Sequence, residues 1–310
     1  HLTLRPGEDL IQQAWGVQNF MNRDRLVLTD SGGFQLFSLG LNKLWEKTMS
    51  KRWPLVSLRE DGIKFRSPID GSSHFMSPED AVDIQRALGS DIMMMLDVCS
   101  PGGSNQVTYK KQLAQTHRRA QRQFNYFSDL YDESVWVLFP IVQWGTDRLL
   151  RQESIDFLSN FARDGIAVGG VSVGESREDI QSIVSFTGER LPLDIPRYLM
   201  GVGDRETIRH AILAGYDMFD CVMPTRLWRH GVFYTDQGLS HLTNVRFRHD
   251  HSPLWSESKS GLSKMYTKAY VHHLLREKEM LGGLILSLHN IFFLHQKISE
   301  LREEILNDKA

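Results

Sequence analysis

Residues 215–226 of the chain read GYDMFDCVMPTR. A short apolar run at 218–222 encloses one acidic side chain, Asp220, and a proline and a Thr-Arg pair follow it. A charge at the carboxyl end of a buried strand is costly unless it is paired or functional, and in barrel enzymes that edge carries the catalytic groups. Asp220 is therefore the first candidate for chemistry, although a lone Asp in such a place more often caps a loop or pairs with a basic residue such as Arg226.

The same design, an apolar run that ends in glycine or a polar side chain, recurs along the chain. Comparable positions are held by Asp30, Asp97, Gln143, Gly169-Gly170 and Met200-Gly201. Functional groups at the ends of successive strands are typical of a (β/α)8 TIM barrel, whose strand ends meet at one face. A doubly wound sheet would gather them at one switch point, and no Gly-x-Gly-x-x-Gly opens a helix here. The pattern therefore favours the α/β class and the TIM barrel.

The hydrophobic periodicity predicts alternating strands and helices in the middle of the chain. Ser77 is expected to cap a helix that starts at Pro78 and ends at Gly89. Strands are expected at 91–96, 135–142, 166–168, 198–200 and 218–222, and helices at 108–130, 148–163, 177–187 and 207–213. Residues 61–75 indicate a hairpin that turns at Asp70-Gly71. Such alternation predicts parallel strands joined by crossover helices.

The pattern changes after residue 230. Residues 231–247 indicate short β segments with a turn at Asp236-Gln237-Gly238, and two helices are expected at 263–280 and 286–306. No low-complexity linker or internal repeat separates these segments from the rest. We therefore expect a barrel core at 1–230 and an appended part at 231–310 whose last helices complete the barrel.

Composition limits the classes of protein that fit. The hydrophobic fraction of 41% is ordinary for a globular protein, and no apolar run approaches the roughly 20 residues of a membrane span. Cys99 and Cys221 are too few for a disulfide framework or a closed thiolate metal site, so we expect a cytoplasmic protein. A formal net charge of -2 gives no global signal for nucleic acid, so such a contact needs a local basic patch.

Four blocks resemble the signature blocks of the tRNA-guanine transglycosylases. They are DSGGFQ at 30–35, VGGVSVGE at 168–175, YLMGVG at 198–203 and FDCVMPTR at 219–226. The blocks occur in the family's order, and the similarity runs from His1 to about Arg302. The resemblance implies an enzyme that exchanges guanine at the wobble position of tRNA anticodons for a 7-deazaguanine base. It also implies a family N-terminal segment, with one barrel strand, that we expect this chain to lack.

The resemblance implies a role for each matching acidic residue. Asp220 resembles the nucleophile that holds the ribose C1′ covalently while one base leaves and another enters. Asp30 resembles the general acid/base that protonates the leaving guanine and deprotonates the incoming base. The presence of both disfavours one alternative, a non-catalytic partner subunit of the same family. A second alternative is a phosphate-binding lyase or isomerase with Gly201-Val202-Gly203 as its phosphate loop.

A purine pocket is also implied by the resemblance. Its expected residues are Ser31, Phe34, Asp97, Gln143, Gly170, Val171 and Met200. In this pocket Asp97 and Gln143 pair with the base edge, while the side chains at 34 and 200 sandwich the ring. Trp144 departs from the family's Gln-Gly-Gly, and its indole can narrow the pocket, stack on a base or point away into packing. Cys99 and residues 171–174 resemble the bacterial pattern, which slightly favours a small aminomethyl-deazaguanine over queuine.

The family's structural zinc site has the form Cys-x-Cys-x-x-Cys with a distant His. At the matching places this chain has Ser258, Ser260 and Ser263, and His289 stands at the position of the fourth ligand. Serine hydroxyls are poor zinc ligands, so we expect no metal and no other cofactor. We also expect residues 256–262 to be the most mobile part of the region and the family's homodimer to be weakened.

A basic surface for tRNA is suggested after the nucleophile and along the appended part. The expected contacts are Arg226, Arg229, His230, Lys264 and Lys268. Local positive charge anchors phosphates, while the pocket must read the base. Taken without the resemblance, a basic helix is more often only a solvated face. The expected partners are therefore tRNA, a 7-deazaguanine base and a second copy of the chain.

Overall fold

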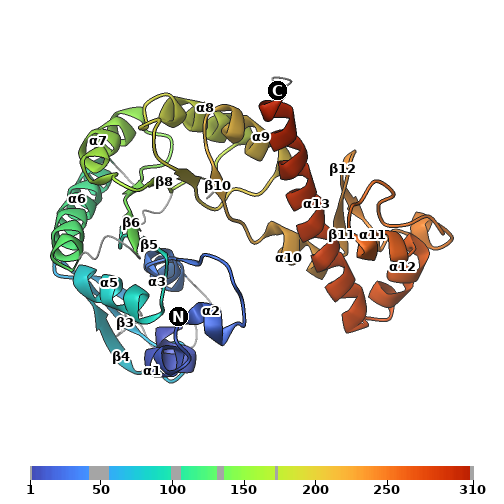
Figure 1. Cartoon of the computed structure of the whole chain (residues 1–310), viewed down its shortest axis with the longest axis horizontal. Coiled ribbons are helices and arrows are strands. Elements are labelled where there is room, and N and C mark those ends of the chain that lie inside the picture. The colour runs from blue at the N-terminus through green and yellow to red at the C-terminus, as the bar shows by residue number, and fades with distance from the viewer. Residues whose placement is uncertain (1, 42–55, 99–105, 131–135, 172–173, 308–310) are drawn as a thin grey trace. The chain divides into compact units, whose positions relative to one another are not determined.

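The computed structural model describes residues 2–41, 56–98, 106–130, 136–171 and 174–307, and the ribbon is shown in Figure 1. The chain forms two compact units. The first unit comprises His1–Met200 with Ala214–Met218, and the second comprises Gly201–Leu213 with Phe219–Ala310. The expected boundary between a barrel core at 1–230 and an appended part at 231–310 stays a prediction.

The first unit is built on parallel strands that follow one another in chain order. One group is β1 (Leu28–Thr29), β5 (Ile92–Met94) and β6 (Val137–Phe139), and the other is β7 (Ile141–Val142), β8 (Ile166–Val168), β9 (Arg197–Leu199) and β10 (Met218–Phe219). The pairs β1–β5, β5–β6, β7–β8 and β8–β9 are all parallel. Pro140 has no N–H to donate, and it divides the strand expected at 135–142 into β6 and β7. The α/β class with parallel strands is confirmed.

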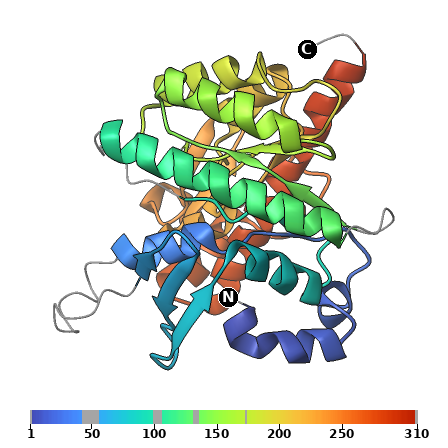
Figure 2. The same ribbon diagram turned by 90° about the vertical axis from the view of Figure 1, so that its left-hand side faces the viewer.

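Helices lie between these strands along the chain, and they run along the outer side of the strands in Figure 1. They are α5 (Pro78–Ala87), α6 (Gln106–Asp129), α7 (Arg148–Leu158) and α8 (Arg177–Gly188). In Figure 2, α6 and α7 run alongside one another, as their contacts require. Ser77 and Asp80 form the expected start of α5 as a capping box, with hydrogen bonds of 3.0 and 2.8 Å between each side chain and the other's backbone N–H.

Short helical elements lie before and after β1 in the chain. They are an irregular helical turn (Thr3–Gly7), α1 (Glu8–Gln13), α2 (Val17–Phe20) and α3 (Gly33–Leu41). The hairpin expected at 61–75 is confirmed as β3 (Ile63–Arg66) and β4 (Ser73–Met76). A third antiparallel strand, β2 (Val56–Leu58), was not predicted and pairs with β3.

The second unit packs a two-stranded ribbon against helices. Its elements are α9 (Arg205–Leu213), α10 (Met223–Leu227), a 3₁₀ turn (Trp228–His230), β11 (Val232–Thr235), β12 (Gly238–His241), a second 3₁₀ turn (Val245–Phe247), α11 (Gly261–Met265), α12 (Lys268–Arg276) and α13 (Met280–Leu306). Phe233, Leu242, Val271 and Leu286 lie in its buried core. None of the helices in the described ranges combines the length and apolar character needed to cross a bilayer.

Two expectations for the C-terminal helices were wrong. The helix expected at 263–280 is two helices, because Thr267 leaves the helical conformation and caps α12 by accepting a 3.2 Å hydrogen bond from the Tyr270 N–H. The helix expected from residue 286 starts at Met280 and includes Gly282 and Gly283. A side-chain carbon on Gly283 would collide with the Trp228 ring, so this glycine allows close packing instead of ending the helix.

Candidate functional site

Asp97 and Gln143 form a buried pair, and each lies just after the carboxyl end of a strand of the first unit. Asp97 lies after β5 and is 4% exposed, and Gln143 follows β7 and is 6% exposed. The Gln143 Nε2 donates a hydrogen bond to Asp97 Oδ2. Burial, and then the negative charge of Asp30, raise the pKa of Asp97 to about 7, although the hydrogen bond from Gln143 lowers it. A carboxyl group titrating near neutrality in this way is typical of a functional site.

Glycines allow the backbone to approach this pair. A side-chain carbon on Gly169 would lie 2.6 Å from Gln143 Nε2, and one on Gly170 would overlap Gln143 Oε1. Gly33 approaches Asp97 in the same way, since its side-chain carbon would lie 3.0 Å from Oδ1. The loops after β1 and β8 therefore meet the Asp97–Gln143 pair through their backbones.

The loop after β1 carries Asp30, Ser31 and Phe34. Asp30 is exposed and accepts a long 3.4 Å hydrogen bond from the Gly32 N–H, whereas Ser31 is buried. Phe34 lies in the first turn of α3 and is 51% exposed, so core packing does not account for this ring. The structure thus brings Asp30 and its loop together with Asp97, as expected for one site.

Val171 lies after β8, and Met200 directly follows β9. The Met200 N–H donates a 3.0 Å hydrogen bond to Val168 O, which places this half-buried side chain beside the end of β8. Val171 is buried. Cys99 and residues 172–173, which bear on the choice of base, lie outside the described residues.

Asp220 directly follows β10 in the second unit. Its carboxylate is exposed, and Oδ1 accepts a 2.8 Å hydrogen bond from the Gly201 N–H. The strand expected at 218–222 ends at Phe219, and Val222 has a helical conformation as the residue that directly precedes α10. A side-chain carbon on Gly203 would overlap Cys221, so this glycine makes room for the Asp220 segment. This geometry gives no support to the interpretation of 201–203 as a phosphate loop.

Trp144 lies beside Gln143, and its indole points into packing. The ring is buried with Leu113 and Leu150, and Tyr109 contacts its edge at 6.4 Å between ring centroids. Its backbone φ of 98° is in the region that favours glycine. Of the three possibilities for Trp144, packing is the one found.

The basic residues expected to meet tRNA all lie in the second unit. The exposed ones are Arg226, Arg229, His230 and Lys264. Lys268 differs because it is partly buried, with its Nζ 2.9 Å from Ser252 Oγ and 3.6 Å from Asp250 Oδ2. Its charge is therefore shared with a carboxylate of its own unit.

Of the three serines at the positions expected for zinc ligands, Ser263 lies beside His289. Ser263 Oγ and His289 Nδ1 lie 3.0 Å apart, and His289 Nε2 lies 2.9 Å from Tyr234 O. Burial lowers the pKa of His289, so the neutral ring donates from Nε2 to Tyr234 and accepts from Ser263 at Nδ1. Neutral hydroxyls do not supply the thiolates that a structural zinc needs. Among the described residues, no group of three or more His, Cys, Asp or Glu side chains could hold a metal.

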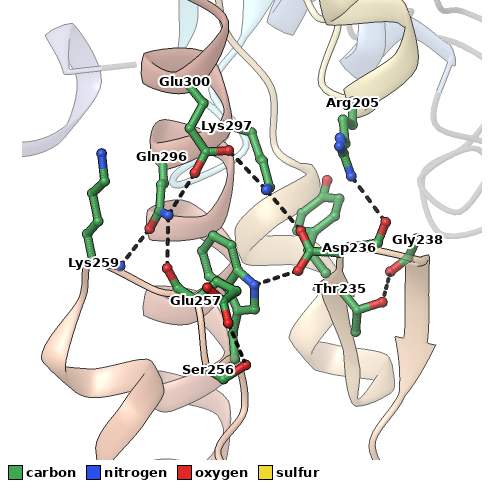
Figure 3. Close-up of polar contacts among 12 residues, drawn as sticks. Arg205, Thr235, Asp236, Gly238, Ser256, Glu257, Lys259, Gln296, Lys297 and Glu300 are labelled. Carbon is green, nitrogen blue, oxygen red and sulfur yellow. Dashed lines mark hydrogen bonds and ion pairs between the residues drawn. The ribbon is translucent and has the colours of Figure 1, made fainter. Parts of the chain in front are cut away.

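Polar contacts from α13 hold the segment around these serines. Gln296 accepts a 2.7 Å hydrogen bond from the Lys259 N–H and donates one of 3.1 Å to Glu257 O, as Figure 3 shows. Lys297 lies 2.9 Å from Asp236 in the β11–β12 turn, and Asp236 also accepts from Trp255 Nε1 at 2.7 Å. Sequence reasoning missed this network because Gln and Lys on a helix resemble a solvated face. The mobility of residues 256–262 stays a prediction.

Comparison with known proteins agrees with the resemblance. A family model described as queuine tRNA-ribosyltransferase matches residues 1–310. A queuine tRNA-ribosyltransferase of Halothermothrix orenii is 41% identical over 308 residues, which cover 99% of this chain and 78% of that protein. One of Prochlorococcus marinus is 43% identical over 291 residues, covering 94% and 74%. One of Caldanaerobacter subterraneus is 40% identical over 309 residues, covering 100% and 78%. The chain therefore belongs to the queuine tRNA-ribosyltransferase family, a family of tRNA-guanine transglycosylase enzymes.

Proposed function

We propose that this chain exchanges guanine at the wobble position of tRNA anticodons for a 7-deazaguanine base. The observation that carries the proposal is the buried Asp97–Gln143 pair with the glycine backbone beside it. Guanine presents N–H donors at N1 and N2 and an acceptor at O6. A carboxylate accepts from the two donors and an amide N–H donates to O6, whereas adenine would present an acceptor to the carboxylate. The pair thus suits a guanine-like edge.

The covalent step is assigned to Asp220. A carboxylate oxygen bonds to the ribose C1′ as the C1′–N9 bond breaks, and the leaving guanine takes a proton from Asp30. The incoming base gives its N9 proton to Asp30 and attacks C1′, and the C1′–carboxylate bond breaks. The hydrogen bond from the Gly201 N–H orients the Asp220 carboxylate for this role. The phosphodiester backbone of the tRNA stays intact throughout.

The remaining parts of the proposal concern the surroundings of the site. The exposed ring of Phe34 and the half-buried Met200 are suited to sandwich the base. Arg226, Arg229, His230 and Lys264 are exposed, and in this proposal they bind tRNA phosphates together with the partly buried Lys268. The parallel strands are paired in the order in which they occur along the chain, which supports the proposal of a (β/α)8 barrel. A tRNA substrate and only two cysteines support a cytoplasmic enzyme, which we propose is a weakened homodimer.

Exchange of labelled guanine into tRNA tests the proposal. Asp220→Ala is expected to abolish exchange while tRNA binding persists, and denaturing gels should show a covalent protein–tRNA adduct with the parent chain only. Asp30→Asn keeps the shape but cannot carry the proton, so exchange should fall on the order of 10² to 10⁴-fold. An active Asp220→Ala variant refutes the covalent role. Competition between aminomethyl-deazaguanine and queuine against labelled guanine then identifies the incoming base, and we favour the former.

A further inference from the structure

Arg151, in the first turn of α7, is fully buried at 0% exposed. Its Nε and Nη2 donate to Gly145 O at 2.9 and 2.7 Å. Nη2 also donates to Gly169 O at 3.1 Å and lies 3.4 Å from Gly170 O. Nη1 reaches Val142 O at 3.5 Å. One guanidinium therefore joins the segment after β7 to the segment after β8.

The contacts of this guanidinium in the described parts of the chain are all with carbonyl oxygens. Burial lowers the pKa of Arg151 to about 10, and the more distant Tyr216 and Glu175 act against this shift. Arg151 therefore remains a cation at neutral pH. A buried charge whose only partners are carbonyl oxygens destabilises the fold unless its hydrogen bonds are well formed. The planar guanidinium of arginine can donate to several carbonyls at once. Lysine has a single nitrogen and cannot reproduce this arrangement.

Both joined segments carry groups of the candidate pocket. Gln143 lies between Val142 and Gly145, and its side-chain amide fits against Gly169 and Gly170. One turn along α7, the buried Ser154 accepts a 3.3 Å hydrogen bond from the Gln143 N–H. Two residues on the same face of α7 therefore hold Gln143 in place. Ser154 binds the backbone N–H of Gln143, and Arg151 binds carbonyls of the two segments around it.

The backbone conformation of Trp144 also requires that this segment be restrained. Its φ of 98° is unfavourable for a residue with a side chain, and such a conformation persists only where the surroundings enforce it. Arg151 holds the carbonyl of Gly145 on one side of Trp144, and Leu113 and Leu150 hold the indole. The position of the neighbouring Gln143 amide depends on these restraints.

We propose that Arg151 is a positioning residue for base recognition. It keeps the Gln143 amide in register with the Gly169–Gly170 backbone, and Ser154 assists it. This inference rests on the proposed function, because Gln143 must read the base for its position to matter. A displacement of about 1 Å in such a group is enough to lower the rate substantially.

Arg197 offers a matched control in the same unit. It is 2% exposed, and its guanidinium also donates to backbone carbonyls, those of Gly188, Leu191 and Pro192 at 2.7 to 3.0 Å and that of Gly215 at 3.5 Å. These carbonyls lie before β9 or before β10, whereas the pocket residues follow the strands. Replacing either arginine removes the same chemistry from the core, but only one replacement touches the segment of Gln143.

The test measures melting temperature, kcat, and KM for guanine and for tRNA in Arg151→Lys, Arg151→Met, Arg197→Lys and Arg197→Met. All four are expected to melt below the parent. Only the Arg151 variants should raise KM for guanine, by about tenfold, which is ~1.4 kcal/mol. Their KM for tRNA should stay within about twofold, and lysine should be milder than methionine. Equal guanine KM values in the Arg151 and Arg197 variants would overturn the inference.

Ser154→Ala keeps the test decisive if the arginine variants do not fold. Loss of one hydroxyl should raise KM for guanine about threefold, in line with a single hydrogen bond of modest net strength. An unchanged guanine KM in this variant counts against the inference. A parent chain that exchanges no guanine at all refutes the proposed function instead, so the two failures are distinguishable.

Discussion

Gln143 donates a hydrogen bond to Asp97 within the core, where each polar side chain satisfies the other. The pair is therefore arranged before any base binds, which lowers the cost of ordering it. The same burial leaves Asp97 with a pKa of about 7, so its charge changes within the physiological range. A carboxylate held in this way lowers the stability of the folded state above its pKa, and under the proposed function it recognises the base.

Asp97→Asn is expected to stabilise the protein at pH 8. The folded-state pKa is raised above the unfolded value, so the native state binds more protons between about pH 4 and pH 7 and stability falls as pH rises through that window. Asparagine keeps an acceptor for Gln143 without the buried charge. We expect a gain on the order of 1–4 kcal/mol at pH 8, from about 1.4 kcal/mol per pKa unit.

Urea unfolding of parent and variant at pH 4 and pH 8 measures this gain. The difference between the two proteins should shrink toward pH 4, because Asp97 is then protonated in the folded state and about half protonated in the unfolded state. Parent and variant share every other titratable group, so the contributions of those groups to stability cancel in the comparison. His289 is one of them, and its lowered pKa makes stability rise with pH, opposite to the effect of Asp97. A variant that is less stable than the parent at pH 8 would contradict a buried, destabilising carboxylate.

The affinity for the base should depend on the same proton. The donors at N1 and N2 of guanine require the ionised carboxylate of Asp97, so KM for guanine should rise as pH falls below about 7. Below the midpoint we expect a rise of about tenfold per pH unit, as for a single essential ionised group. Initial rates between pH 5.5 and 8.5 measure it. The idea fails if KM is flat over this range in the parent chain.

Several site residues could be predicted from the sequence because glycine and acidic residues end its apolar runs. Asp30, Asp97 and Gln143 follow strands as expected, and the parallel order of the strands brings them together. The contacts of Arg151 could not be predicted, since two of its partners, the carbonyls of Gly169 and Gly170, belong to a loop 18 and 19 residues along the chain. A buried arginine on an amphipathic helix has the same local pattern as an exposed one.

Boundaries failed where tertiary contacts override local preference. Gly282 and Gly283 favour a break, yet they lie inside α13, where a side-chain carbon would meet Leu274 and Trp228 respectively. The apolar Val222 was assigned to a strand, but this side chain is exposed and its backbone is helical. For the two glycines the deciding contact involves a residue that the local pattern does not contain.

Trp144→Gly and Trp144→Ala should differ in a way that reveals backbone strain. Each loses the buried indole, a deletion that costs about 3–5 kcal/mol. Glycine also relieves the unfavourable φ of 98°, which is worth on the order of 1–3 kcal/mol, whereas alanine does not. We therefore expect the glycine variant to be less stable than the parent but more stable than the alanine variant. Equal stability of the two variants by thermal unfolding would exclude strain at Trp144.

The last prediction concerns the serines around His289. Elemental analysis of the parent chain is expected to find no stoichiometric zinc, because Ser258, Ser260 and Ser263 supply hydroxyls where the metal needs thiolates. His289 is already oriented for a metal. Its Nε2 donates to Tyr234 O, the kind of contact that commonly fixes a ligating histidine, and this leaves Nδ1 toward Ser263.

Replacing all three serines by cysteine should recover one zinc per chain, with His289 as the fourth ligand. Structural zinc is worth roughly 10–16 kcal/mol in isolated zinc-finger peptides at pH 7, but here Gln296 already holds the segment at Glu257 and Lys259. We therefore expect a higher melting temperature that a chelator reverses, with a gain well below the peptide value. The triple-cysteine chain with His289→Ala is the control and should bind zinc more weakly. Zinc in the parent chain, or none in the triple variant, would show that these serines do not occupy the family's ligand positions.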